Sequence, residues 1–356
     1  MAQRILIKNG RIWDGNAFLE GDILTEDDKI IRIEPNITHE KAYVFDATGM
    51  IVSAGLVDAH MHMLGLSYAE YGISPEAAAF PFGVTAGVDA GSCLGDRRKV
   101  EDLAVKAVLF AGSKIEQNRL NRERTVERIQ RYGEYTIGIK LTLDDTSPNI
   151  SDITPLQEVC ALARELGLKV MLHCSNSPVT MLEIVKTLAP GDILTHVYHG
   201  GKHTCLEEDF AAYRLAKEKG VVLDAAFAGF VHTDFDVLRK AFAAGCFPDT
   251  VSTDITKNSV YKRGGRYGLT MAMSMARTAG MAEEDILRSV TSQPAKALGK
   301  EGVWGSLSVG GPADIAVLEY TDEPFRLEDK AGNVLESSKG YRCRMTVADG
   351  VVVYVD

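Results

Sequence analysis

The sequence predicts an α/β fold in which a (β/α)8 barrel of the TIM type carries a small β-sandwich domain formed from both termini. With 356 residues, the chain is long enough for one full barrel and a small accessory domain. Its middle alternates apolar runs with segments of helical periodicity, whereas both ends are rich in short strand patterns. We therefore expect the β domain in residues 1–54 and 305–356 and the barrel in residues 55–304.

Both ends of the chain show apolar runs that are interrupted by turn signals. The expected N-terminal strands are Arg4–Lys8, which precedes Asn9-Gly10, then Gly21–Leu24, Lys29–Ile33 and Val44–Asp46. The expected C-terminal strands are Asp314–Glu319, Arg344–Ala348 and Val351–Tyr354. Asp349-Gly350 separates the last two, as a two-residue hairpin turn would.

The middle of the chain contains eight candidate barrel strands. They lie near Val57, Val84, Val108, Ile139, Val170, Leu194, Val221 and Val251. Helices are expected over Thr154–Leu166, with Pro155 in the first turn and Gly167 at the end, over Val179–Leu188, and around Leu206, Phe210 and Tyr213. Eight such units close most economically into a barrel, whose chemistry lies at the C-terminal ends of the strands.

Charge and composition exclude several classes of protein. The chain has 39 Lys and Arg against 49 Asp and Glu, and its net charge of -10 would repel a phosphate backbone, so nucleic acid is not an expected partner. No apolar run approaches the roughly 18 residues that span a bilayer, and the start lacks a signal-type segment. The six cysteines form no CxxC pair, which suits a reducing compartment. We expect a soluble, cytoplasmic protein.

Six residues with metal-binding or proton-transfer chemistry fall at the C-terminal ends of the candidate strands. They are His60, His62, Lys140, His173, His196 and Asp254. One such histidine alone is more often a hydrogen-bonded core residue, but six residues in equivalent positions favour a metal site. Lys140 lies inside an apolar strand, where its ammonium group would be desolvated. A buried carboxylate partner is the alternative explanation for that lysine.

At these residues the chain resembles the amidohydrolase superfamily, in the binuclear branch that contains dihydroorotases, hydantoinases and deacetylase-like enzymes. The matching segments are Lys8–Ile12, Gly55–His62, the lysine strand, the two single-histidine strands, Ser252–Asp254 and Gly311–Val317. The resemblance extends over nearly the whole chain and implies a binuclear metal-dependent hydrolase.

The resemblance also implies a ligand set and a mechanism. Lys140 would be carboxylated by CO2 and bridge two divalent ions, one held by His60, His62 and Asp254 and the other by His173 and His196. The ions would acidify a bridging water to hydroxide, and Asp254 would accept and return its proton. Zinc suits this ligand set, although manganese, iron or cobalt would also fit.

The expected reaction is hydrolysis of an amide or ester, such as removal of an acetyl group from a small molecule, with carboxylated molecules among the candidate substrates. Related dihydroorotases usually have an arginine where this chain has Leu64, and acetylglucosamine-phosphate deacetylases usually have a glutamate in place of His62. The first departure disfavours hydrolysis of a cyclic ureide, and the second disfavours a sugar-phosphate substrate. The alternatives are a cyclic amidase, a deaminase, which usually lacks the bridging lysine, and a non-enzymatic scaffold, which usually lacks ligands. A homo-oligomer is a further possibility.

Other residues have functional interpretations that are less specific. His199 is a candidate substrate contact, and Lys202 is a weaker one or simply solvated. Cys93 occupies a position where related D-aminoacylases supply a metal ligand, although a core or rim thiol is the simpler interpretation. The arginine-rich run 119–131 is either a lid for an anionic substrate or a solvated helix face.

Overall fold

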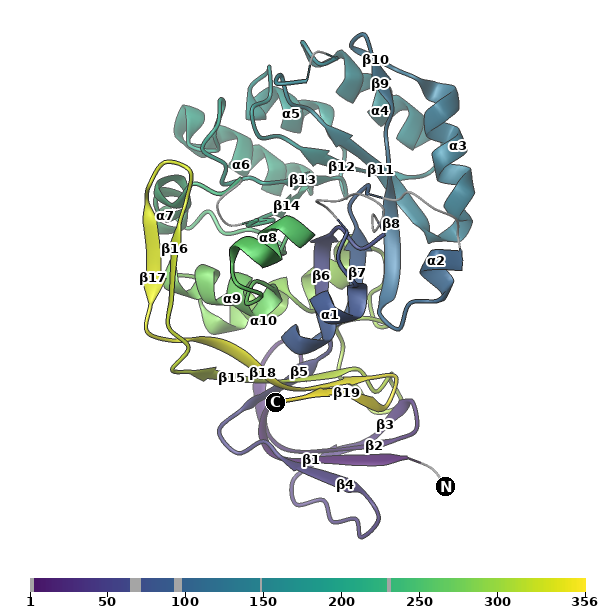
Figure 1. Cartoon of the computed structure of the whole chain (residues 1–356), viewed down its shortest axis with the longest axis vertical. Helices are drawn as coiled ribbons and strands as arrows, with labels where there is room; N and C mark the ends of the chain where they lie inside the picture. Colours follow the sequence, from purple (N-terminus) through teal and green to yellow (C-terminus); the bar gives the residue numbers. More distant parts are fainter. Residues whose placement is uncertain (1–2, 65–71, 93–97, 148, 229–231) are drawn as a thin grey trace.

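The computed structural model describes residues 3–64, 72–92, 98–147, 149–228 and 232–356. It contains a parallel barrel sheet surrounded by helices, with a second sheet built from both termini packed below it (Figure 1). The predicted fold class is confirmed. No helix in the described ranges is long and apolar enough to cross a membrane.

Seven parallel strands form the barrel sheet, in the spatial order β14-β13-β12-β11-β8-β7-β6. The strands are β6 (Leu56–Met61), β7 (Val84–Asp89), β8 (Lys106–Gly112), β11 (Thr136–Thr142), β12 (Lys169–His173), β13 (Ile193–Thr195) and β14 (Val222–Asp224). All seven correspond to candidate strands from the sequence. The apolar runs between helical segments therefore identify these buried parallel strands correctly.

The eighth candidate, near Val251, is not a regular strand in the structure. Residues 250–255 nevertheless fill the gap between β14 and β6 through isolated parallel bridges, Asp224 to Thr250 and Met61 to Ile255. Within this segment the backbone turns into the left-handed region at Asp254, where φ is 50°. This turn aims the Asp254 side chain at the mouth of the barrel.

Helices surround the barrel (Figure 1). They are α1 (Pro75–Ala79), α2 (Arg98–Glu101), α3 (Arg122–Tyr132), α4 (Thr154–Glu165), α5 (Met181–Thr187), α6 (Glu207–Lys219), α7 (Phe235–Ala243), α8 (Lys257–Lys262), α9 (Leu269–Thr278), α10 (Glu283–Ser289) and α11 (Ser292–Ala297), with short 3-10 turns at Phe80–Phe82 and Gly133–Tyr135. The three helices expected from the sequence are confirmed as α4, α5 and α6. A capping box between Thr180 and Glu183 begins α5.

Both termini contribute to one continuous eight-stranded sheet in which β5 links the two ends of the chain. Its strands are β1 (Arg4–Trp13), β2 (Phe18–Glu26), β3 (Lys29–Glu34), β4 (Tyr43–Asp46), β5 (Ile51–Ala54), β15 (Ile315–Thr321), β18 (Gly340–Ala348) and β19 (Val351–Val355). Asp349 and Gly350 both have positive φ, as the expected hairpin turn requires. Asn9 and Gly10, in contrast, form an irregularity inside β1 and do not end it.

Two short hairpins lie outside these sheets and were not expected from the sequence. One consists of β9 (Ile115–Glu116) and β10 (Arg119–Leu120), and the other of β16 (Phe325–Glu328) and β17 (Val334–Ser337). The second hairpin rises beside α7 on the outside of the barrel (Figure 1). Asp329 at its turn accepts a hydrogen bond from the Phe235 N–H group at the start of α7.

Candidate active site

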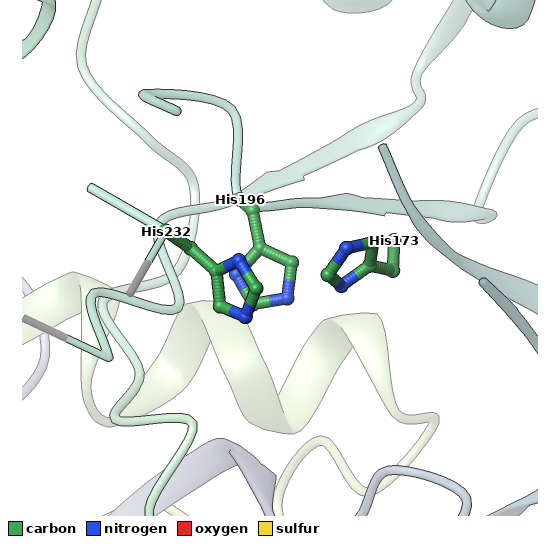
Figure 2. Close-up of side chains that lie close together, drawn as sticks. All are labelled: His173, His196 and His232. Carbon is green, nitrogen blue, oxygen red and sulfur yellow. The ribbon is translucent and has the colours of Figure 1, made fainter. Parts of the chain in front are cut away.

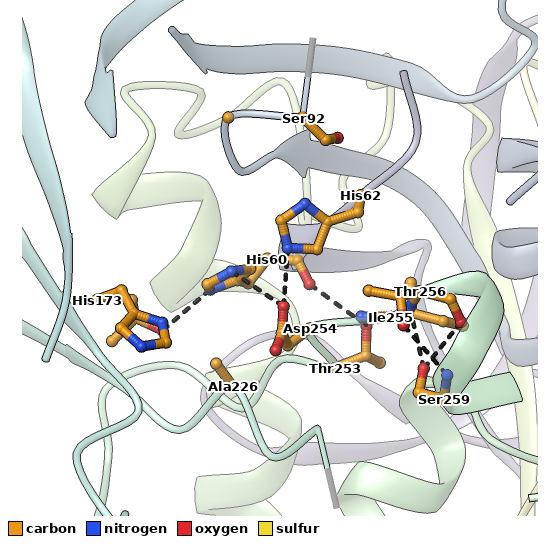
Figure 3. A network of polar contacts seen from close by, with 12 residues as sticks. His60, His62, Ser92, His173, Ala226, Thr253, Asp254, Ile255, Thr256 and Ser259 are labelled. Carbon is orange, nitrogen blue, oxygen red and sulfur yellow. Dashed lines mark hydrogen bonds and ion pairs between the residues drawn. The ribbon is translucent and has the colours of Figure 1, made fainter. Parts of the chain in front are cut away.

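The first cluster of potential metal ligands contains His60, His62 and Asp254, whose ligand atoms all lie within 4.8 Å of one another. His60 lies in β6, and His62 is the first residue after that strand. Asp254 lies in segment 250–255 and has a left-handed backbone conformation. Asp254 Oδ1 is 2.9 Å from His62 Nε2 and 3.3 Å from His60 Nε2 (Figure 3). One carboxylate oxygen thus faces two imidazole nitrogens, an arrangement that a shared cation would stabilise.

A second cluster consists of three imidazoles, His173, His196 and His232 (Figure 2). His173 ends β12 and His196 directly follows β13, as the sequence predicts, whereas His232 comes from the loop after β14. The three ring centroids are 4.3 to 4.8 Å apart. Ser175 lies between two of the rings, because its Oγ is 2.9 Å from His173 Nε2 and 3.0 Å from His232 Nδ1.

Lys140 is buried, and its Nζ lies 3.3 Å from His60 Nε2. Within the described ranges, Lys140 has no ion-pair partner at salt-bridge distance, so the buried-carboxylate explanation receives no support. Burial lowers the pKa of Lys140 to about 8, and the nearby carboxylates of Asp254 and Asp224 oppose that shift. Roughly one tenth of the side chain is therefore a neutral, nucleophilic amine at pH 7, far more than for an exposed lysine.

Asp224, which the sequence analysis did not single out, controls the orientation of His60. Its carboxylate accepts hydrogen bonds from the hydroxyls of Thr195 (2.8 Å), Thr250 (2.7 Å) and Ser252 (2.6 Å). Because the Thr195 hydroxyl donates to Asp224, its oxygen is left to accept from His60 Nδ1, 2.9 Å away. This arrangement places the proton on His60 Nδ1 and directs the Nε2 lone pair at the cavity, as in metal sites where a carboxylate orients a histidine ligand.

Asp58 holds β6 against residues 250–255. Its carboxylate accepts hydrogen bonds from the Thr253 hydroxyl (2.6 Å), the Thr253 N–H (3.1 Å) and the His60 N–H (3.2 Å). Burial raises the pKa of Asp58 to about 7, while these donors oppose the shift. Asp58 thus joins the backbone at both ends of the first ligand cluster, although it does not itself face the cavity described below.

The protonation states of the histidines suit the binding of divalent metal ions. Burial lowers the pKa of His60, His173 and His196 well below the ordinary value, so these imidazoles are neutral and carry a lone pair. His196 Nδ1 lies 3.1 Å from the carbonyl oxygen of Ala226, which fixes its proton there and leaves Nε2 as the ligand atom. His196 and Asp254 both have positive φ, and such strained backbone is concentrated at functional sites.

Lys140 should make the stability of metal-stripped protein depend on pH. Its pKa is about 8 in the folded protein and near 10.5 when exposed, so the unfolded chain binds more protons between these values. The free energy of unfolding therefore rises with pH in this window. Relative to K140M, we expect the wild type to gain about 1 kcal/mol between about pH 7 and about pH 9 in urea denaturation. A difference between the two proteins that does not change with pH would contradict the lowered pKa.

Both clusters open into a cavity of about 750 Å³ at the C-terminal ends of the strands. All six predicted site residues line it, and so does His232. Ser113, Arg128, Asp144, Asn149 and Asn258 contribute further polar lining. The volume is that of a small-molecule site, and its polar groups converge on the two clusters.

The structure does not bring His199 or Lys202 into the ligand clusters. His199 is buried and is not among the described lining residues, and its Nδ1 accepts a hydrogen bond from the Gly201 N–H. Its contact with a substrate stays a prediction that this geometry does not support. Lys202 is paired with Asp145 at the surface. Cys93 lies outside the described residues, and the arginine-rich run contains β10 and α3.

Comparison with curated proteins gives relatives with hydrolase names. A deacetylase of Agrobacterium fabrum is 26% identical over 324 residues, which cover 85% of this chain and 78% of that protein. A deacetylase of Enterococcus faecalis is 26% identical over 371 residues and covers 98% of both chains. A dihydroorotase of Aquifex aeolicus is 23% identical, over 99% of this chain and 100% of that protein.

Solved structures share the architecture. The crystal structure of an adenine deaminase has a TM-score of 0.85 and 24% identity, over 99% of this chain and 100% of the other. The crystal structure of a dihydroorotase has a TM-score of 0.84 and 23% identity, over 99% and 98% of the two chains. The model of the amidohydrolase family matches residues 51–353, which include both ligand clusters and Lys140. The chain belongs to the amidohydrolase family and is a metal-dependent hydrolase.

Proposed function

We propose that the protein is a binuclear deacylase, which hydrolyses an amide or ester bond of a small acylated molecule. The observation that carries this proposal is that both ligand clusters line one cavity with the buried amine of Lys140, whose Nζ lies 3.3 Å from His60 Nε2. A site for one ion would not need the lysine. The deacetylase names of two relatives support this reaction over the other chemistries of the family.

In this proposal His60, His62 and Asp254 hold one divalent ion, and His173, His196 and His232 hold the other. Zinc suits such imidazole-rich sites. The neutral amine of Lys140 attacks the carbon of CO2, forms an N–C bond and releases one proton to solvent, which gives an anionic carbamate between the clusters. When bound, the two ions would lower the pKa of water and polarise the acyl carbonyl.

Asp254 is the proposed proton carrier. His60 and His62 hold its Oδ1, whereas Oδ2 faces the cavity side, 3.8 Å from His232 Nε2. A carboxylate in this position accepts the proton from the attacking water and delivers it to the leaving nitrogen or oxygen. The left-handed backbone at Asp254 and the hydrogen bond from its N–H to the His60 carbonyl (2.8 Å) keep the side chain in this orientation.

The residue at position 64 supports a deacylase over a dihydroorotase. The position at which dihydroorotases usually have a substrate-binding arginine is occupied by Leu64, whose side chain is buried and whose N–H donates to Asp89 Oδ2 (2.8 Å). An apolar, buried side chain cannot take the place of that arginine. The proposal is tested with metal-loaded protein and a panel of N-acyl amino acids, O-acyl hydroxy acids of both hands, cyclic ureides and dipeptides. Turnover of the cyclic ureides alone would contradict it.

His232 should contribute to the affinity of the second ion. Its Nδ1 is held by Ser175, which leaves Nε2 as the atom that faces the site. We expect H232Q to weaken binding of the second equivalent of zinc by at least about tenfold, as measured by calorimetric titration of stripped protein. His203, which is paired with Glu207 outside the clusters, provides the matched control H203Q. Two unchanged binding steps in H232Q would remove His232 from the ligand set.

A further inference from the structure

The cavity contains one cation that the proposed chemistry does not use. Arg128 belongs to α3 on the outside of the barrel, but its partly buried side chain turns inward and lines the cavity. Lys140 is the only other lysine or arginine among the described lining residues, and it lies at the floor. Arg128 is therefore the permanently charged cation of this lining.

The other arginines of α3 behave differently. Arg122 is paired with Glu165, Arg124 with Glu116 (3.1 Å) and Arg131 with Glu127 (3.1 Å), and all three are exposed. Arg128 has no carboxylate partner in the described part of the chain. Its Nη1 donates a hydrogen bond to the carbonyl oxygen of Gly112 at 2.9 Å. A guanidinium group has five N–H donors, so this contact fixes its position and leaves most of its donors for another acceptor.

The Gly112 carbonyl holds Arg128 close to the reaction centre. Gly112 ends β8 and is the register partner of Lys140 in the adjacent strand β11, and hydrogen-bonded strands lie about 5 Å apart. The Ser113 N–H also donates to the carbonyl oxygen of Lys140 (2.8 Å). The guanidinium and both ligand clusters line the same cavity, so one small molecule bound there can face both.

We propose that Arg128 binds a carboxylate group of the substrate and so selects acyl compounds that carry one negative charge. This inference rests on the proposed deacylase function and adds the substrate class. The planar guanidinium matches a carboxylate through two parallel hydrogen bonds. Asp144 lines the same cavity beside His173, 4.0 Å from its Nε2, and disfavours a second negative charge such as that of a phosphate monoester.

The test uses N-acetyl amino acids and their neutral primary carboxamides, which present the same acetyl group. Ligand-observed NMR on metal-loaded protein gives both dissociation constants and any release of acetate. We expect the wild type to bind the acids more tightly than the amides and R128M to reduce this preference by about tenfold or more. The control is R131M, because Arg131 lies in the same helix but is exposed to solvent and paired with Glu127. This variant should keep the preference of the wild type. R128K, which retains the charge without the planar fork, should keep part of it.

Two results would overturn the inference. One is an equal preference for acids in R128M and the wild type. Arg128 would then only support the Gly112 backbone, and a lower melting temperature of R128M would not change that conclusion. The other is a wild type that does not distinguish the acids from the amides. Failure of the proposed function looks different, because the acids would then bind through Arg128 without any release of acetate.

Discussion

Replacing Asp254 by asparagine should lower kcat by about two to four orders of magnitude while the protein stays folded. Asparagine has nearly the same shape and retains one oxygen that faces His60 and His62, but its amide cannot accept the proton of the attacking water. The measurement is kcat at saturating metal with the best substrate of the acyl panel. Metal content per chain is determined on the same samples, so that loss of proton transfer is separated from loss of an ion.

Asp145 provides a matched control for this substitution. It lies near the same face of the barrel, but it is paired with Lys202 and is not among the described residues that line the cavity. D145N should therefore retain the kcat of the wild type. Near-normal turnover of D254N, with metal content unchanged, would refute the proton-carrier role of Asp254.

Replacing Lys140 by alanine should remove most of the activity, because the proposed carbamate can no longer form between the clusters. Loss of a bridging anion weakens the contribution of both ions, which supply several kcal/mol in such sites, so we expect a decrease of about two orders of magnitude or more. The substitution also opens space beside Gly91, whose α-carbon faces the Lys140 side chain. Short carboxylic acids such as acetate or propionate should enter this space and restore part of the activity.

The rescue experiment separates a bridging role from a structural one. An alkylamine of similar size restores volume but not the anion, so it should not rescue K140A. A crystal structure of the metal-loaded wild type gives direct evidence, since the carbamate adds density beyond Nζ. Density that ends at an unmodified amine between two occupied metal positions would contradict the proposal.

Periodicity in the sequence predicts the barrel well but fails where special backbone geometry is present. Seven apolar runs become strands because they are buried on both sides, which makes them continuous and easy to recognise. The segment near Val251 is not a regular strand, and the positive φ of Asp254 within it cannot be recognised from the sequence. Asn9-Gly10 has the composition of a turn, yet pairing with β2 continues beyond it and produces a bulge.

Candidate site residues are predicted from their position at the C-terminal ends of strands. This criterion misses site residues that lie in loops. The six residues singled out in the sequence all line one cavity. Asp224 satisfies the same criterion, since it closes the apolar run at Val221, and that position could have identified it. His232 lies eight residues farther along in a loop, and only the folded chain brings it to His196. Loop residues are positioned by tertiary contacts that periodicity does not encode.

The most direct test of the account is the metal content of the folded protein. The protein is produced in medium supplemented with zinc or manganese and purified without chelators. Elemental analysis by inductively coupled plasma mass spectrometry should then find about two divalent ions per chain. Substitution of His60 and of His196, one from each cluster, should each remove about one ion. A well-folded wild-type protein that consistently retains no divalent ion would contradict the binuclear site and the hydrolase mechanism built on it.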